Sequence, residues 1–435
     1  METSSKQELK KSLKPLHFWG IAVGLVISGD YFGWNYGLRS GALEFLIATI
    51  IVTLLYITFT FSFTELSTAI PQAGGPFAYS KRALGNSGGF IAGFATLVEF
   101  LFAAPAGAYA LGSYINFLIP ELNPILISLC FLGLFTAINL MGIQQAANFE
   151  LFITIIASIG IIVYIALVFP HSSPSSIFTR EKPIRFDSIF SAIPFAIWFY
   201  LAIEGVAMTA EESENPQKDI PTGYILGIGT LILFALGTMI LTAGIGHTDQ
   251  LVKNDHPLPE SLSILYGKGN RYSFIFALFG IVGIMASLLG AILGYSRQIY
   301  AVAREGFLPE FLSKLSKSNG SPSAACIAGS LIGAIAILSG RTDKLITLAA
   351  IGALVMYQIS MISLFVLRKK EPDLKRPFRA PLYPYFPMAA LVLSTICLLS
   401  IIISNPILSG VFFALLGISF LLFIITIRKD QNQES

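Results

Sequence analysis

The sequence predicts an all-α integral membrane protein with twelve transmembrane helices, and two observations carry this prediction. First, 54% of the 435 residues are hydrophobic and only 12% are charged, whereas soluble domains carry about 25% charged residues. The mean hydropathy is correspondingly high, at +0.73. Second, a helix needs about 20 mostly apolar residues to cross a bilayer, and twelve such runs occur. They lie near 17–38, 42–70, 88–117, 123–143, 148–170, 188–211, 221–246, 272–300, 323–339, 343–367, 384–404 and 407–427.

The twelve predicted helices divide into two groups of five and a final pair. Because five is an odd number, a second copy of a five-helix group has to insert upside down in the membrane. We therefore expect a first five-helix repeat and an inverted second one, then two added helices, with a tail at each end. These units correspond to 17–170, 188–367 and 384–427, with the tails at 1–16 and 428–435.

Lysine and arginine residues predict the orientation of the helices, because cytoplasmic loops carry an excess of them. With an even number of helices, both tails lie on one side of the membrane. The tails and loops of that side hold 19 basic residues, against 9 on the other side. We therefore expect a multi-pass protein of the cell membrane with both termini in the cytoplasm.

Composition and motifs argue against several other classes of protein. The net charge of +3 is too small to suggest a nucleic-acid partner. The three cysteines form no CxxC pair, and the absence of an HExxH motif or other ligand cluster predicts no metal and no cofactor. The stretch "GNSGG" at 85–89 fits the GxSxG pattern of hydrolases, but it follows a basic loop instead of a strand. Without a Walker A sequence either, we expect neither an enzyme nor an ATP-driven pump.

Glu44, Glu65 and Glu150 lie near the ends of predicted helices. Three other acidic residues lie well inside them, namely Asp30 in helix 1, Glu99 in helix 3 and Glu204 in helix 6. Each costs about 2.5–3.5 kcal/mol at the centre of a membrane on insertion scales. Such a residue persists when it faces a cavity or a partner. The alternative is a structural carboxylate that is hydrogen-bonded to a neighbouring helix.

Two of these acidic residues lie beside glycine, which weakens a helix by about 1 kcal/mol relative to alanine. Asp30 lies between Gly29 and Gly33, and Glu204 precedes Gly205. Helices 1 and 6 occupy matching positions in the two groups of five, and broken helices in matching positions are typical of secondary transporters. We therefore predict that both helices unwind here and that their freed peptide groups face a substrate pocket. The alternative is that these glycines only allow neighbouring helices to pack closely, without any unwinding.

Three longer stretches resemble the amino acid–polyamine–organocation superfamily. They are "IPQAGGPFAYSKRALG" at 70–85, "AEESENPQKDIPTGY" at 210–224 and "YSRQIYAVAREGFLPEFLSK" at 295–314. With the twelve helices, the resemblance covers nearly the whole chain. It implies the leucine-transporter type of fold, which is a five-plus-five inverted repeat with two added helices.

Within that superfamily, "GDYFGWNYGL" at 29–38 and "WFYLAIEGVAMTAEE" at 198–212 resemble the ethanolamine permeases. In amino acid carriers of the superfamily, the loop at the helix 1 break receives the substrate carboxylate. The matching positions here are Gly33, Trp34 and Asn35, so a bulky indole occupies the place of the carboxylate. This departure fits ethanolamine, which has no carboxylate.

Trp198 and Glu204 match a tryptophan and a glutamate of the arginine–agmatine exchangers in that superfamily. The resemblance implies that Trp198 covers the substrate as a gate and that Glu204 helps to couple protonation to transport. Other coupling or gating candidates are Glu99 and Ser287. The coupling ion is left open between a proton and sodium.

The expected ligand is a small amine, whose ammonium group needs hydrogen-bond acceptors and an electron-rich wall. Unwound backbone around Tyr31 and at Leu201 and Ala202 provides carbonyl acceptors, and Asp30 or Glu204 can add a charge-assisted bond. The candidates for a cation–π contact are Trp34, Trp198 and Tyr200, and those for the hydroxyl group are Asn35 and Ser287.

The function predicted from the sequence is import of ethanolamine by alternating access. Two alternatives in the same class are a general amino acid permease and an exchanger of amines or amino acids. A nutrient-sensing receptor on a transporter fold is an alternative of another class.

Overall fold

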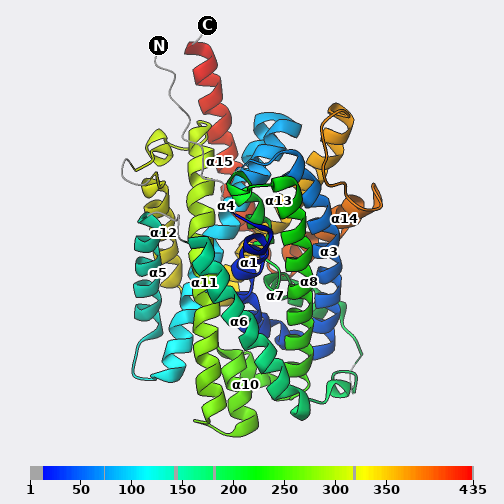
Figure 1. Cartoon of the computed structure of the whole chain (residues 1–435), viewed down its shortest axis with the longest axis vertical. Coiled ribbons are helices and arrows are strands. Elements are labelled where there is room, and N and C mark those ends of the chain that lie inside the picture. Colours follow the sequence, from blue (N-terminus) through cyan, green and yellow to red (C-terminus); the bar gives the residue numbers. More distant parts are fainter. Residues whose placement is uncertain (1–12, 73, 142–145, 180–182, 317–319, 434–435) are drawn as a thin grey trace.

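The computed structural model describes residues 13–72, 74–141, 146–179, 183–316 and 320–433, and in that part all regular elements are helices (Figure 1). A helix satisfies its backbone N–H and C=O groups internally, as a chain in lipid requires. The eight longest α-helices are α3 (Ala42–Ala69), α4 (Gly75–Leu118), α6 (Ala146–Val168), α8 (Pro216–Ala243), α11 (Arg271–Arg304), α13 (Thr342–Lys370), α14 (Tyr385–Ser404) and α15 (Pro406–Gln433).

The shorter elements include the pieces of the two predicted broken helices. The first predicted helix consists of α1 (Pro15–Val26), α2 (Ser28–Tyr31) and the 3-10 helix η1 (Trp34–Ser40), and the sixth consists of α7 (Phe186–Trp198) and η4 (Ile203–Glu212). The others are η2 (Phe169–His171), η3 (Pro174–Ile177), α5 (Pro124–Leu140), α9 (Thr248–Leu251), α10 (Pro257–Tyr266), η5 (Glu310–Ser313) and α12 (Ser323–Ile337).

An all-α membrane protein is confirmed, because nine helical segments of the described chain are long and apolar enough to cross a membrane. Two shorter apolar helices, α5 and α12, coincide with the predicted spans 123–143 and 323–339. The first predicted span, 17–38, is divided into three pieces. The count of twelve, the inverted repeat and the limits of the predicted units remain predictions.

The long helices run along the length of the molecule and surround α1, which lies near its centre (Figure 1). From Phe18 onward α1 is almost completely buried. The outer helices show the opposite pattern, with large apolar side chains such as Leu233 and Ile335 that are 66% and 72% exposed. An apolar exterior around a packed interior fits a protein solvated by lipid.

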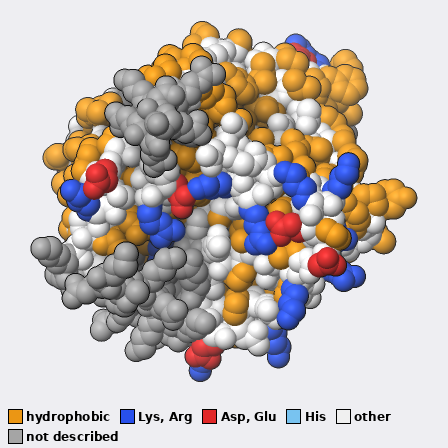
Figure 2. Space-filling view, turned by 90° about the horizontal axis from the view of Figure 1, so that it is seen from above, with side chains coloured by type: hydrophobic (Ala, Val, Ile, Leu, Met, Phe, Trp, Pro, Cys, Tyr) orange, Lys and Arg blue, Asp and Glu red, His pale blue; other side chains and the backbone are white. Residues whose placement is uncertain are grey.

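The C-terminal helix α15 extends to one end of the molecule (Figure 1). Figure 2 looks onto this end, where Lys and Arg side chains lie beside Asp and Glu. The ion pairs here include Arg82 with Glu371 and Arg368 with the buried Glu65. The placement of this end in the cytoplasm remains a prediction.

Candidate functional site

The helix 1 break lies at Phe32 and Gly33, inside the stretch predicted from its glycines. Phe32 is extended (φ −154°, ψ 167°), and Gly33 has a φ of 85°, a conformation that favours glycine. The freed N–H of Gly33 donates a hydrogen bond to Asn35 Oδ1 at 3.0 Å. One of the amides exposed by the break is therefore already satisfied within the chain.

The helix 6 break lies at Ala202, where unwound backbone was expected, and not at Gly205 itself. Helix α7 ends at Trp198, and Ala202 adopts the left-handed conformation (φ 76°, ψ 9°) before η4 begins. The N–H of Ala202 donates to Glu99 Oε1 at 3.2 Å, which compensates the lost helical hydrogen bond. Gly205 instead allows close packing, because a Cβ there would lie 2.6 Å from a methyl group of Leu25.

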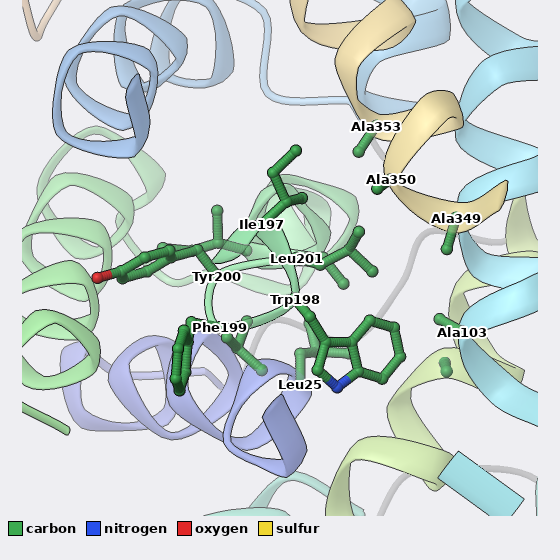
Figure 3. Close-up of a cluster of buried hydrophobic side chains, with 14 of the residues drawn as sticks. Leu25, Ala103, Ile197, Trp198, Phe199, Tyr200, Leu201, Ala349, Ala350 and Ala353 are labelled. Carbon is green, nitrogen blue, oxygen red and sulfur yellow. The ribbon is translucent and has the colours of Figure 1, made fainter. Parts of the chain in front are cut away.

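The two breaks lie against each other at Trp198. A Cβ added to Gly33 would lie 2.6 Å from the indole Nε1 of Trp198, and the ring of Phe32 meets the indole edge-on at 5.4 Å between centroids. Figure 3 shows the indole pointing toward Leu25 and Ala103, away from the rings of the next two residues.

A small buried cavity of about 20 Å³ adjoins this tryptophan. Its volume is enough for about one water molecule, so a ligand has to be small or has to displace side chains. The lining residues, from α1, α2, α4, α7, the helix 6 break and α11, include Ser28, Ala103, Trp198, Leu201, Ala202 and Ser287. The structure thus brings four predicted site residues, Trp198, Leu201, Ala202 and Ser287, into one cavity, which we call the central cavity.

Trp198 has an unused hydrogen-bond donor, whereas the hydroxyl group of Ser287 is already hydrogen-bonded within the protein. Among the described residues, the buried indole Nε1 of Trp198 has no hydrogen-bond partner. The hydroxyl group of Ser287 donates to the carbonyl of Gly24 at 2.6 Å and accepts from the N–H of Ser28 at 3.2 Å. Trp198 therefore retains a donor for a ligand, whereas Ser287 joins α11 to helix 1.

Asp30 and Tyr31 are buried behind the central cavity and do not line it. Neither carboxyl oxygen of Asp30 has a hydrogen-bond partner among the described residues. The hydroxyl group of Tyr31 donates to the carbonyl of Ala157 at 2.7 Å, and its own carbonyl accepts from Tyr114 at 2.7 Å. Tyr31 thus links helix 1 to α6 and α4.

Trp34 also lies outside the central cavity. Its Nε1 donates to the backbone carbonyl of Asp30 at 3.0 Å, and its ring stacks on Phe45 and Phe199. The indole thus fills the space beside the break and caps a freed carbonyl group.

Asn35 binds the loop that connects α8 to α10. Its Nδ2 donates to the carbonyls of Leu251 and Asn254 at 2.7 and 2.9 Å. In the same loop, Asp255 accepts from the hydroxyl group of Tyr36 at 2.7 Å. We call residues 247–256 the α9 loop. Both amide functions of Asn35 are therefore engaged, the oxygen at the helix 1 break and the nitrogen at the α9 loop.

The sequence carried no signal for the α9 loop contacts. Asp255 also accepts from Thr342 at 3.3 Å, and Arg39 pairs with Asp343. These residues come from separate elements, and no motif joins them. Burial raises the pKa of Asp255 to about 6.

The last two predicted residues, Glu99 and Glu204, face each other instead of the central cavity. Glu99 Oε2 and Glu204 Oε1 have no hydrogen-bond partner among the described residues. The hydroxyl group of Tyr357 donates to Glu204 Oε2 at 3.3 Å. The structure therefore gives both glutamates partners on neighbouring helices.

A second cavity, of about 30 Å³, shares the lining residue Leu25 with the central cavity. It is lined by Ile21, Leu25, Phe100, Glu150 and Arg297, among others.

Two broken helices that meet beside a buried cavity, with a loop closed over one end, define a membrane transporter. The sequence matches the amino acid permease family over residues 13–428, and the chain belongs to that family, within the amino acid–polyamine–organocation superfamily. Its relatives are permeases and transporters, so it is a transporter and not an enzyme.

Similar proteins carry different ligands. The branched-chain amino acid permease BcaP of Bacillus subtilis is 24% identical over 92% of this chain and 90% of its own length. The low-affinity putrescine importer PlaP of Escherichia coli K12 is 25% identical, over 88% of this chain and 87% of its own. The human cystine/glutamate transporter is 26% identical, over 98% and 88%. Identities this low leave the substrate to be argued from the site.

Proposed function

We propose that this transporter imports ethanolamine, a small amine without a carboxylate, across the cell membrane by alternating access. The observation that carries the proposal is the state of the helix 1 break. The N–H of Gly33 is bonded to Asn35, and the indole of Trp198 lies directly over Gly33. Of the three positions that match the carboxylate loop, Gly33 has its backbone amide engaged, and the approach to that amide is covered.

The side chains around the central cavity also favour a ligand without a carboxylate. Among the described residues that line it, none is charged, so no arginine or lysine would pair with a substrate carboxylate. An ammonium group needs only carbonyl acceptors and an aromatic face. Trp198 supplies the face, and a desolvated cation–π contact is worth up to about 2 kcal/mol.

The free donor of Trp198 suits the other end of ethanolamine. A buried N–H without a partner costs about 1–3 kcal/mol, and the hydroxyl oxygen of the ligand would recover this by accepting a hydrogen bond. The putrescine importer among the relatives supports an amine as the ligand class. The branched-chain amino acid permease supports the rival, a general amino acid permease.

Uptake of radiolabelled ethanolamine into proteoliposomes tests the proposal. Saturable uptake and counterflow are expected, with inhibition by unlabelled ethanolamine at least about tenfold stronger than by alanine, a difference of about 1.4 kcal/mol. N-acetylethanolamine, which lacks the ammonium group, should not compete.

Two results would contradict the proposal. Equal competition by alanine would favour the general amino acid permease. Binding of ethanolamine without any counterflow would favour a receptor on a transporter fold.

A further inference from the structure

We propose that the second cavity is a further binding site for a small primary ammonium ion, with the carboxylate of Glu150 as its counter-charge. The site stands on the residues that line this cavity. That its natural ligand is ethanolamine, on its way through the protein, rests on the proposed function.

The two cavities are stacked along the same helices. From the shared residue Leu25, the central cavity continues along helix 1 to Ser28, whereas the second cavity continues in the opposite direction to Ile21. On α11, the lining correspondingly moves from Ser287 to Gly294. The two cavities therefore lie roughly one to two helical turns apart. A ligand in one cavity is close to the other.

Glu150 reaches the second cavity between helix 1 and α11, because both helices carry glycine where its carboxyl group approaches. A Cβ added to Gly24 would lie 3.5 Å from Glu150 Oε1, and one added to Gly290 would lie 3.8 Å from the same atom. Glu150 is only 8% exposed. A carboxylate that is removed from water in this way is stabilised by a cation beside it.

An aromatic ring lies against the next turn of α11. A Cβ added to Gly294, one turn after Gly290, would overlap with the ring of Phe100. The same ring lies 3.5 Å from the Cβ position of Gly205 in η4. Because residues one turn apart are neighbours on a helix surface, the carboxylate of Glu150 and the ring of Phe100 line one small space.

A carboxylate beside an aromatic ring suits an ammonium group. The carboxylate accepts a charge-assisted hydrogen bond from it, and the face of the ring attracts the cation. The cavity also contains the guanidinium group of Arg297, whose Nη1 lies 3.5 Å from the carbonyl oxygen of Met208. The N–H groups of Arg297 suit the hydroxyl oxygen of ethanolamine, which is an acceptor.

The volume of the second cavity restricts its ligand. About 30 Å³ holds about two water molecules, which is close to the size of methylammonium. Ethanolamine is larger, and the long flexible side chains of Met208 and Arg297 can move to accommodate it. Methylammonium is therefore the probe for the site itself.

Equilibrium binding of radiolabelled methylammonium to the purified protein tests the site. The expected isotherm contains a component that depends on Glu150. Glu150→Gln keeps the size of the side chain and removes its charge, so it should weaken this component at least about tenfold. The matched control is Glu44→Gln, a buried glutamate of α3 that lines neither cavity, which should bind as the wild type does.

Phe100→Leu distinguishes the site from a general effect of charge. Removal of the Glu150 charge also acts on the central cavity at a distance, whereas Phe100→Leu changes no charge. It should weaken the same component as Glu150→Gln, because the ring contact is lost. Its control is Phe94→Leu, at a ring of α4 that packs on Phe90 and Phe412 and lines neither cavity.

Methylammonium binding that is the same in the wild type and in Glu150→Gln would overturn the site. So would a loss in Glu150→Gln that Phe100→Leu does not share, because the charge would then act from a distance.

Uptake of ethanolamine into proteoliposomes separates this proposal from the proposed function. If methylammonium binding depends on Glu150 and Phe100 but the wild type takes up no ethanolamine, the proposed substrate fails and the site stands. If ethanolamine is taken up but methylammonium binding does not depend on Glu150, the site fails and the proposed substrate stands.

Discussion

Gly29 lies against the backbone of Trp198, so close that an added Cβ would be 2.3 Å from the carbonyl oxygen of Trp198. This contact brings the backbones of helix 1 and helix 6 together beside the central cavity. Such an approach is possible only without a side chain. The relative position of the two broken helices therefore depends on this glycine.

Gly29→Ala should separate the two broken helices. Overpacking of this kind costs about 1–3 kcal/mol, so we expect a lower unfolding temperature in detergent and a strong loss of counterflow. Gly229→Ala in α8 is the control, since nothing lies within 4 Å of its added Cβ. If both variants have the same unfolding temperature and counterflow, the contact between Gly29 and Trp198 does not fix the position of helix 1.

Trp198→Phe keeps an aromatic face and removes the free Nε1 donor. Binding of ethanolamine should weaken about tenfold, the effect of one lost hydrogen bond of about 1.4 kcal/mol. Binding of propylamine, which has no hydroxyl group, should hardly change. Trp19→Phe is the control, because that indole donates to Thr230 away from the central cavity. An equal loss for both amines would show that Nε1 does not contact the hydroxyl group.

Asp30→Asn tests a long-range charge effect. The carboxyl group of Asp30 is buried without a hydrogen-bond partner among the described residues and does not line the central cavity. If it is ionised when ligand is bound, it attracts the ammonium group through the low-dielectric interior. The variant should then lose affinity for ethanolamine by about tenfold and keep its affinity for neutral 1,2-ethanediol, measured by competition. Equal losses for both ligands would argue against a charge role.

The α9 loop should be held more tightly as the pH falls. Burial raises the pKa of Asp255 to about 6, from 3.8 for the ordinary group. A group whose pKa is higher in the docked loop stabilises docking fully below the lower value, and this contribution is lost as the pH rises through about 6. Hydrogen exchange of residues 247–256 should therefore show more protection at about pH 5 than at about pH 7, after correction for the intrinsic exchange rate.

Asp255→Asn should abolish this dependence on pH, because the side chain no longer titrates. Asp249→Asn, at an exposed position of the same loop, should leave it unchanged. Protection that is independent of pH in the wild type would mean that Asp255 does not control docking.

Part of the site was predictable from the sequence because it depends on local chemistry. The unwinding of helix 1 follows from Gly33, because glycine is the residue type that adopts a positive φ without strain. The position of Trp198 at the cavity followed from its resemblance to a gating tryptophan. Unwound backbone at Ala202 was also expected, but its hydrogen-bond partner was not, because Glu99, which accepts from the N–H of Ala202, lies on another helix.

The amino-acid sequence by itself determined that this chain is a membrane transporter with an interrupted first helix. The reason is that the length of an apolar run and the backbone conformation of a glycine both depend on residues that are close together in the sequence. Only the tertiary structure decided what each polar side chain does. Asn35 closes a loop, Ser287 ties two helices, and Glu99 accepts from the N–H of Ala202 at the helix 6 break. The reason is that a buried polar group is satisfied by whichever helix lies beside it, and that neighbour is more than 100 residues away in the chain.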